Sequence, residues 1–180
     1  FIVCLVIASS IITVLTTNDN SQAGGFIPSL IGSTEESQHK GYKVTRVVDG
    51  DTIDVEIDGK KEAIRFLGIN TPESVDPRRP VQCFGREASK EMKELLKGGY
   101  VLLESDPDKE DRDKYGRLLR YVYRESDNLL LNEYMIKEGY AYEYTYEGTY
   151  KFKDQWKQLQ KEAEAAGRGL WNKNTCAGKK

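Results

Sequence analysis

Hydrophobic and polar residues alternate along the segment TIDVEID, residues 52–58, which predicts a β-strand with one buried face. Ile53, Val55 and Ile57 share that face, and acidic residues occupy the other. Asp58-Gly59, which follows, is a strong hairpin signal, so a partner strand is expected directly after it. Three further segments have strand character. The strands are expected at residues 42–48, 52–58, 61–68, 100–105 and 117–123.

Apolar residues recur at helical spacing in three other segments. In REASKEMKELLKGG, Ala88, Met92 and Leu95 lie on one stripe, and a double glycine ends the segment. The helices are expected at residues 86–97, 129–138 and 151–166. This order predicts an α+β fold, namely a five-stranded OB-type Greek-key β-barrel with about three α-helices. From the pattern alone, other α+β arrangements stay open.

The amino-terminal segment has a different composition from the rest of the chain. Residues 1–15, FIVCLVIASSIITVL, carry no charge and precede a polar stretch, as a secretory h-region does. We therefore expect residues 1–23 to be a signal peptide, or a membrane anchor if apolar residues precede them. Residues 24–40 are predicted to be a flexible linker, 41–176 the folded domain and 177–180 a basic tail. The expected location is extracellular, with a membrane-anchored extracytoplasmic domain as the alternative.

The charge and the histidine content limit the kinds of catalytic or metal site that the chain can build. Because residues 1–39 hold three acidic residues and no Lys or Arg, the remainder is nearly neutral, which neither requires nor excludes a nucleic-acid partner. The one histidine, His39, lies in the predicted linker. The folded domain therefore has no histidine for a Ser triad, a Cys-His pair or a zinc site. Carboxylate, arginine, lysine and tyrosine remain, and these groups suit hard cations and phosphate.

Cys83 and Cys176 are the two cysteines of the predicted folded domain. In an exported protein, two cysteines far apart in sequence suggest one disulfide. A bridge closing so long a loop would stabilise the fold by roughly 4 to 5 kcal/mol in the chain-entropy model. Two unpaired thiols are the alternative.

The segment VVDGDT sets two carboxylates, Asp49 and Asp51, around Gly50. Short acidic loops supply the oxygen ligands that calcium prefers. Asp-Gly is also a common turn dipeptide, and Ile53 stands where an EF-hand needs a third oxygen ligand. Taken alone, this segment is better explained as a turn than as a metal site.

Arg65 interrupts the apolar strand AIRFLGI, and an arginine at such a position needs a partner. NTPE follows five residues later and offers the Asn70 amide oxygen, the Thr71 carbonyl and the Glu73 carboxylate. A carboxylate of this kind can draw a proton from an attacking water.

A second arginine, Arg117, lies in DKYGR beside Lys114 and Tyr115. Two arginines and a cation suit a phosphodiester, because forked guanidinium donors match phosphate oxygens and stabilise the charge that grows in the transition state.

The ordered motifs VVDGDT, IRFLGINTPE, FGREAS, DKYGR and GLW resemble those of the staphylococcal nuclease (thermonuclease) family. The resemblance extends over residues 42–171, nearly the whole predicted domain. It implies an OB barrel and a calcium-dependent endonuclease and exonuclease that cuts DNA and RNA to 3′-phosphate ends. A monomer is expected.

The resemblance also implies residue roles. Asp51 and the Thr71 carbonyl would bind Ca²⁺, Arg65 and Arg117 would hold the phosphate, and Glu73 would be the general base. Lys114 and Tyr115 match positions that bind the terminal phosphate, and Tyr144 or Tyr146 would stack on a base. Family members usually carry aspartate where this chain has Asn70. An amide oxygen can still bind Ca²⁺, so we expect weaker calcium affinity or use of another divalent ion.

Two other functions compete with a nuclease. The first is a catalytically weak nucleic-acid-binding OB module of the same fold. Such modules tend to lose the arginines and acids, whereas Asp51, Arg65, Glu73 and Arg117 are all present. The second is an extracellular calcium-dependent adhesion domain, which would leave both arginines without a purpose.

Overall fold

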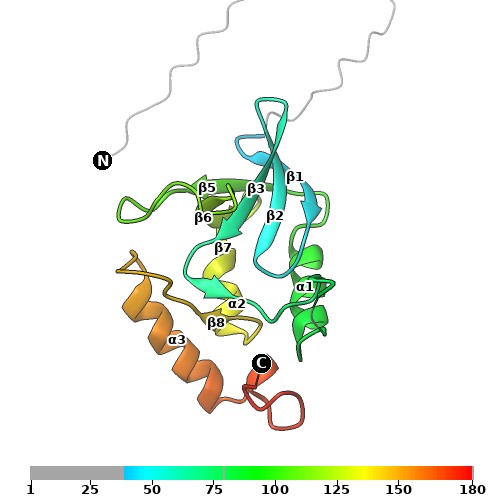
Figure 1. Ribbon diagram of the computed structural model, residues 1–180, viewed down its shortest axis with the longest axis vertical. Coiled ribbons are helices and arrows are strands. Elements are labelled where there is room, and N and C mark those ends of the chain that lie inside the picture. Colours follow the sequence, from blue (N-terminus) through cyan, green and yellow to red (C-terminus); the bar gives the residue numbers. More distant parts are fainter. Residues whose placement is uncertain (1–38, 79, 180) are drawn as a thin grey trace, which may run out of the picture. The chain divides into compact units, whose positions relative to one another are not determined.

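The computed structural model of the chain describes residues 39–78 and 80–179. Within this part, one sheet has the strand order β3-β2-β1-β5-β6-β7, and β3 also pairs in parallel with β6 (Figure 1). That last pairing closes β1, β2, β3, β5 and β6 into a barrel. The strands of this sheet are β1 (Tyr42–Val47), β2 (Thr52–Ile57), β3 (Lys60–Phe66), β5 (Tyr100–Glu104), β6 (Leu118–Arg124) and β7 (Leu129–Leu130). The predicted five-stranded barrel is confirmed.

Helices pack against this barrel, and α2 contacts both β6 and α3. The described residues form α1 (Gly85–Leu95), α2 (Leu131–Lys137), α3 (Lys153–Ala165) and the 3₁₀ turn η1 (Gly169–Trp171). The prediction placed the start of the second helix two residues too early. Leu129 and Leu130 instead pair with Arg124 and Tyr123 as β7, because a short strand there extends the sheet edge.

A short ladder that the sequence pattern did not predict joins β4 (Ile69–Asn70) to β8 (Tyr142–Glu143). It pairs Asn70 with Tyr142, residues far apart in the chain. The tyrosine-rich segment after β8 therefore lies beside the NTPE segment.

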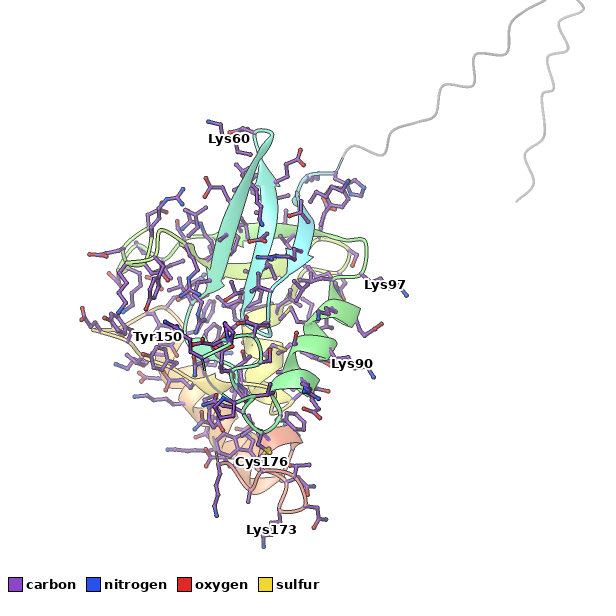
Figure 2. All side chains as sticks on the ribbon, turned by 45° about the vertical axis from the view of Figure 1, so that its right-hand side comes forward. Lys60, Lys90, Lys97, Tyr150, Lys173 and Cys176 are labelled. Carbon is purple, nitrogen blue, oxygen red and sulfur yellow. A yellow bond between two sulfur atoms is a disulfide. The ribbon has the colours of Figure 1, made fainter. Side chains whose placement is uncertain are left out.

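The alternating residues of the strands fill the core as predicted, with Ile53, Val55 and Ile64 fully buried. From α3, Trp156 enters the same core, stacks on Phe152 and meets the Tyr121 ring edge-on. The β2–β3 hairpin extends beyond the core, with Lys60 at its tip (Figure 2).

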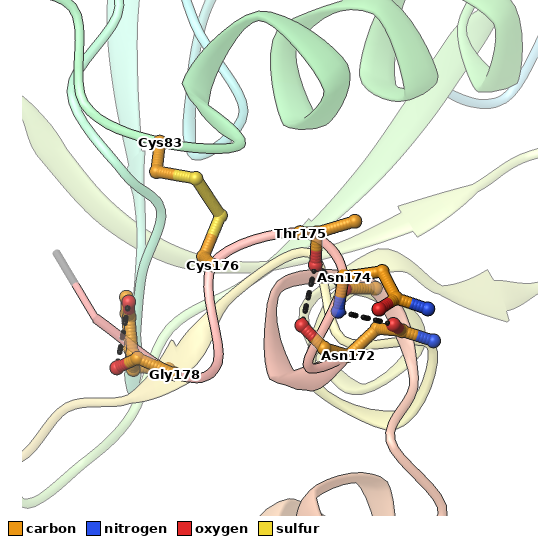
Figure 3. Close-up of a disulfide and its surroundings, with 8 residues drawn as sticks. Cys83, Asn172, Asn174, Thr175, Cys176 and Gly178 are labelled. Atoms are coloured by element: carbon orange, nitrogen blue, oxygen red, sulfur yellow. Dashed lines mark hydrogen bonds between the residues drawn. A yellow bond between two sulfur atoms is a disulfide. The ribbon is translucent and has the colours of Figure 1, made fainter.

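A disulfide joins Cys83, just before α1, to Cys176, beyond η1 (Figure 3). The two Cα atoms are 5.9 Å apart, and the cysteines are separated by 93 residues in sequence. A second, smaller apolar cluster surrounds Cys176. Its members are Tyr142, Leu170 and Cys176, with Phe84 and Trp171 packed against them.

The predicted signal peptide or anchor and nearly all of the predicted linker lie outside the described residues. The last two linker residues are described: His39 stacks on Tyr100, and the Lys40 backbone N–H donates to Glu125. In the part of the chain that the structure covers, every helix is too short or too polar to cross a bilayer.

Candidate active site

The DGDT segment forms the turn between β1 and β2, and its second carboxylate is buried. The Asp49 carboxylate accepts the backbone N–H of Asp51 at 3.1 Å. Asp51 is 5% exposed; its Oδ1 accepts the Thr52 hydroxyl at 3.0 Å and its Oδ2 accepts the Thr71 N–H at 2.7 Å. The segment is thus a turn, as its sequence favours, and it also holds a buried carboxylate against the NTPE segment.

Close packing explains the glycine between these two acids. A Cβ atom at Gly50 would lie 2.7 Å from the Thr71 side chain and 3.0 Å from Ala88. Only glycine lets the turn approach the NTPE segment this closely. Burial, and then the negative charge of Asp51, raise the pKa of Asp49 to about 7. A cation between these acids would relieve that repulsion.

Arg65 lies opposite Thr52 in the β2–β3 ladder, and its side chain contacts Asp51. Its side chain is 12% exposed, and its Nη2 lies 3.2 Å from both Asp51 Oδ2 and Asn70 Oδ1. The partner that the sequence required for this arginine is therefore Asp51, assisted by Asn70 and by a bond from Nη1 to the Phe66 carbonyl at 2.6 Å.

Arg117 is held by Asp113, four residues earlier. Its Nε and Nη2 lie 2.8 and 2.7 Å from Asp113 Oδ2, and its backbone N–H donates to Oδ1 at 3.0 Å. Its Nη1 reaches the Thr52 hydroxyl at 3.5 Å. Since Thr52 donates to Asp51, the two arginines lie at opposite ends of one chain of contacts, Arg117–Thr52–Asp51–Arg65.

Tyr115 projects from the same turn, and its side chain is 72% exposed. Lys114 Nζ and Arg117 Cζ lie 5.2 and 5.4 Å from the centre of its ring. These are cation–π distances. The structure thus brings exposed Lys114 and Tyr115 together with the partly buried Arg117 as a basic group, which Thr52 links to Asp51.

Glu73 belongs to the loop between β4 and α1, and its carboxylate is bound by that loop. Oε1 accepts the backbone N–H groups of Val75 and Asp76 at 2.8 and 3.0 Å. Among the described residues, no hydrogen bond or ion pair links Glu73 directly to Asp51 or Arg65. Glu73 is joined to the site by the backbone, because it follows Thr71 by two residues.

Tyr144 and Tyr146 follow β8 and are 42% and 71% exposed. The Tyr144 N–H donates to the Gly68 carbonyl at 2.9 Å, which holds this segment next to β4. Tyr142 and Tyr150, from the same tyrosine-rich stretch, are buried. The stretch therefore divides into core tyrosines and exposed tyrosines, and the two candidates for base stacking are exposed.

Three residues of this site carry oxygen atoms of different chemical kinds: the Asp51 carboxylate, the Asn70 amide and the backbone carbonyl of Thr71. The first two oxygens face the same arginine nitrogen, and the buried Thr71 donates its backbone N–H to Asp51. The part of the chain that is described contains no group of three or more His, Cys, Asp or Glu residues placed to hold a metal ion. The donors nonetheless match what Ca²⁺ uses, because it binds carboxylate, amide and carbonyl oxygens together.

Three residues of the site were not singled out from the sequence. Thr52 links the two arginines, Asp113 orients Arg117, and Gln82 binds the backbone of Glu73. The four-residue spacing of Asp113 and Arg117 is a signal that could have identified that pair. The roles of Thr52 and Gln82 depend on contacts between separate loops, for which the sequence carries no local signal.

Comparison with known proteins gives the family of the chain. The family model described as "Staphylococcal nuclease homologue" matches residues 63–173. The thermonuclease of Staphylococcus hyicus is 38% identical over 168 residues, which are 93% of this chain and 95% of that protein. The SPbeta prophage-derived endonuclease YokF of Bacillus subtilis (strain 168) is 45% identical over 130 residues, 72% of this chain but 43% of its own length. Endonuclease YncB of the same strain is 42% identical over 142 residues, 77% of this chain and 66% of its own length. The chain belongs to the staphylococcal nuclease family.

Proposed function

We propose that this protein is a calcium-dependent nuclease that hydrolyses phosphodiester bonds of DNA and RNA and leaves 3′-phosphate ends. The contact chain from Arg117 through Thr52 and Asp51 to Arg65 carries the proposal, because it places two guanidinium groups around one buried carboxylate. The names of the relatives, thermonuclease and endonuclease, support the same activity.

The arginines bind and stabilise the phosphate. Guanidinium N–H donors match phosphate oxygens, and ion pairs with Asp51 and Asp113 hold the two charges in place before the substrate arrives. Asp113 holds Nε and Nη2 of Arg117, so Nη1 faces Thr52 and the site. Negative charge that develops on the phosphate oxygens in the transition state would therefore meet two preoriented cations.

Asp51, Asn70 and the Thr71 carbonyl would hold the metal ion. Bound there, Ca²⁺ would add positive charge next to the phosphate. Glu73 is proposed as the general base that takes a proton from the attacking water onto its carboxylate. Lys114 and Tyr115 would bind a terminal phosphate, and Tyr144 or Tyr146 would stack on a neighbouring base.

Cleavage of single-stranded DNA tests this function. The wild-type protein should cut with calcium, EGTA should abolish cutting, and Arg117→Ala should lose most of the activity. Arg168→Ala is a matched control, because the Arg168 side chain donates to the Lys137 carbonyl at the carboxyl-terminal end of α2. Products should need phosphatase treatment before a polymerase can extend their 3′ ends. A folded protein that cuts nothing over a wide range of calcium concentrations would favour a binding module instead.

We also propose that the protein acts outside the cytoplasm. The Cys83–Cys176 disulfide supports this location, since such bonds persist in oxidising compartments. The mass of the protein recovered from medium and from membranes would decide between a cleaved signal peptide and a retained anchor. Recovery of the protein from the cytosol alone would contradict both.

A further inference from the structure

Two hydrogen bonds close the loop that carries Glu73, and both involve Gln82. The backbone N–H of Glu73 donates to Gln82 Oε1 at 2.7 Å. The backbone N–H of Gln82 donates in return to the Glu73 carbonyl at 2.8 Å. Gln82 thus binds the peptide groups on both sides of the Glu73 Cα atom, although eight residues separate the two in sequence.

The start of α1 packs against the same point. The Gly85 N–H donates to the Gln82 carbonyl at 3.0 Å. A Cβ atom at position 85 would lie 2.7 Å from the Glu73 carbonyl oxygen, so the glycine allows the helix to touch the Glu73 backbone. The loop is closed at its base by residues 73, 82 and 85, whereas Val75 and Val81 in between are exposed.

Cys83, next to Gln82, links the closed end of this loop to the carboxyl-terminal turn, residues 172–178. Cys83 forms the disulfide with Cys176, which is 7% exposed and packs with Leu170. The turn is itself held, because Thr175 Oγ1 donates to the Asn172 carbonyl at 2.9 Å (Figure 3). The Gly178 N–H also donates to the Leu170 carbonyl at 2.9 Å. Figure 2 shows Cys176 at the opposite end of the domain from the hairpin tip at Lys60.

We propose that Gln82 is a positioning residue for Glu73, and that the Cys83–Cys176 disulfide keeps Gln82 in place. The inference rests on the proposed function, in which Glu73 is the general base. The Glu73 carboxylate is oriented by its backbone and by the next turn of the loop, since Oε1 accepts from residues 75 and 76. A displacement of about 1 Å at a reacting group can cost about a hundredfold in rate. The carboxyl-terminal turn therefore acts on the position of Glu73 through Cys83 and Gln82, and a thiol reductant should remove this effect.

Substitution of Gln82 separates positioning from general stability. Gln82→Leu has nearly the same size but cannot accept the Glu73 N–H, whereas Gln82→Glu keeps an acceptor at the same place. We expect Gln82→Leu to lower kcat for single-stranded DNA at least tenfold, with KM within about twofold of wild type. Gln82→Glu should recover kcat to within about threefold. Gln158→Leu, on the outer face of α3, is the matched control and should leave kcat unchanged.

Reduction of the disulfide tests the second half of the proposal. A dithiol such as dithiothreitol breaks the S–S bond by giving two electrons and two protons, and becomes a cyclic disulfide itself. Wild-type kcat should fall at least tenfold on reduction and return on reoxidation. The double variant Cys83→Ser, Cys176→Ser should show the reduced value with or without the dithiol. Circular dichroism at the assay temperature reports whether each form is folded.

The outcomes distinguish the two proposals. If the wild-type protein cleaves DNA while folded Gln82→Leu and folded reduced protein keep full kcat, the positioning role is wrong and the nuclease function stands. If Gln82→Glu is as slow as Gln82→Leu, the hydrogen bond that residue 82 accepts from the Glu73 N–H does not affect kcat, and the positioning role of Gln82 is refuted. If the oxidised wild-type protein shows no cleavage at all, the proposed function fails and the inference fails with it. Should the double serine variant not fold, Gln82→Leu, which retains the disulfide, still decides whether Gln82 positions Glu73.

Discussion

Replacing Asn70 by aspartate is the most direct test of the metal site. Asn70 Oδ1 lies 3.2 Å from Arg65 Nη2, and the same nitrogen is 3.2 Å from Asp51 Oδ2. The substitution therefore places a second carboxylate next to the first one without changing the size of the side chain. Calcium affinity should rise, because affinity depends on the number of charged ligands.

Coulomb's law gives the size of the effect. A carboxylate and a divalent cation about 4 Å apart attract each other by ~2 kcal/mol even at the dielectric constant of water. The amide oxygen already supplies part of this energy, and the new carboxylate at position 70 is also attracted to Arg65. We expect a net gain of about 1.4 kcal/mol, which is about a tenfold lower half-saturating calcium concentration.

The assay is the initial rate of single-stranded DNA cleavage over a series of calcium concentrations, at one pH and one ionic strength. Asn128→Asp makes the same charge change in the exposed turn between β6 and β7 and should leave the half-saturating concentration unaltered. An unchanged or higher half-saturating concentration in Asn70→Asp would refute the reasoning, because the residue would then not contribute to the calcium shell.

Three further substitutions test the phosphate clamp and the fold. Arg117→Lys keeps the charge but loses the fork, so kcat/KM for DNA should fall about a hundredfold with little change in Tm; equal activity would contradict the clamp. Burial opposes ionisation of Asp106, but hydrogen bonds from Tyr121 and backbone N–H groups outweigh it and lower the pKa of Asp106. Its stabilisation is therefore present above the ordinary Asp pKa and is lost as pH falls through the lowered one. Urea titrations should show Asp106→Asn about 2 kcal/mol less stable than wild type at pH 7, with a smaller difference near pH 2. Gly68→Ala should lower the midpoint of thermal unfolding by several degrees, because its Cβ atom would lie 2.6 Å from the Trp156 ring and the backbone φ is +70°; an unchanged midpoint would mean that this contact relaxes freely.

Prediction from sequence succeeded where periodicity is local. The alternation at Ile53, Val55 and Ile57 identified β2, and the Asp58-Gly59 turn fixed its register with β3. The start of α2 was placed too early because Leu129 and Leu130 have the same apolar character in a strand as in a helix. The β4–β8 ladder escaped prediction, since two-residue strands leave no periodic signal.

For the candidate site, the sequence supplied the chemical groups and the fold supplied their neighbours. Absence of histidine from the predicted domain, residues 41–176, together with two arginines and nearby acids, was enough to predict phosphate and cation chemistry. Which atoms meet could not be predicted. That Asp51 accepts from Thr71 and pairs with Arg65, and that Thr52 links it to Arg117, follows from the barrel closing β3 onto both β2 and β6.

The sequence by itself determined the order of the five barrel strands and the three helices, and the family, because hydrophobic period, turn residues and motif order are local properties of a chain. The tertiary structure alone decided that Gln82 binds both peptide groups of Glu73 and that the carboxyl-terminal turn supports this loop through Cys176. Such contacts join residues far apart in sequence, and their geometry is set by how the barrel, α1 and the carboxyl-terminal turn pack together.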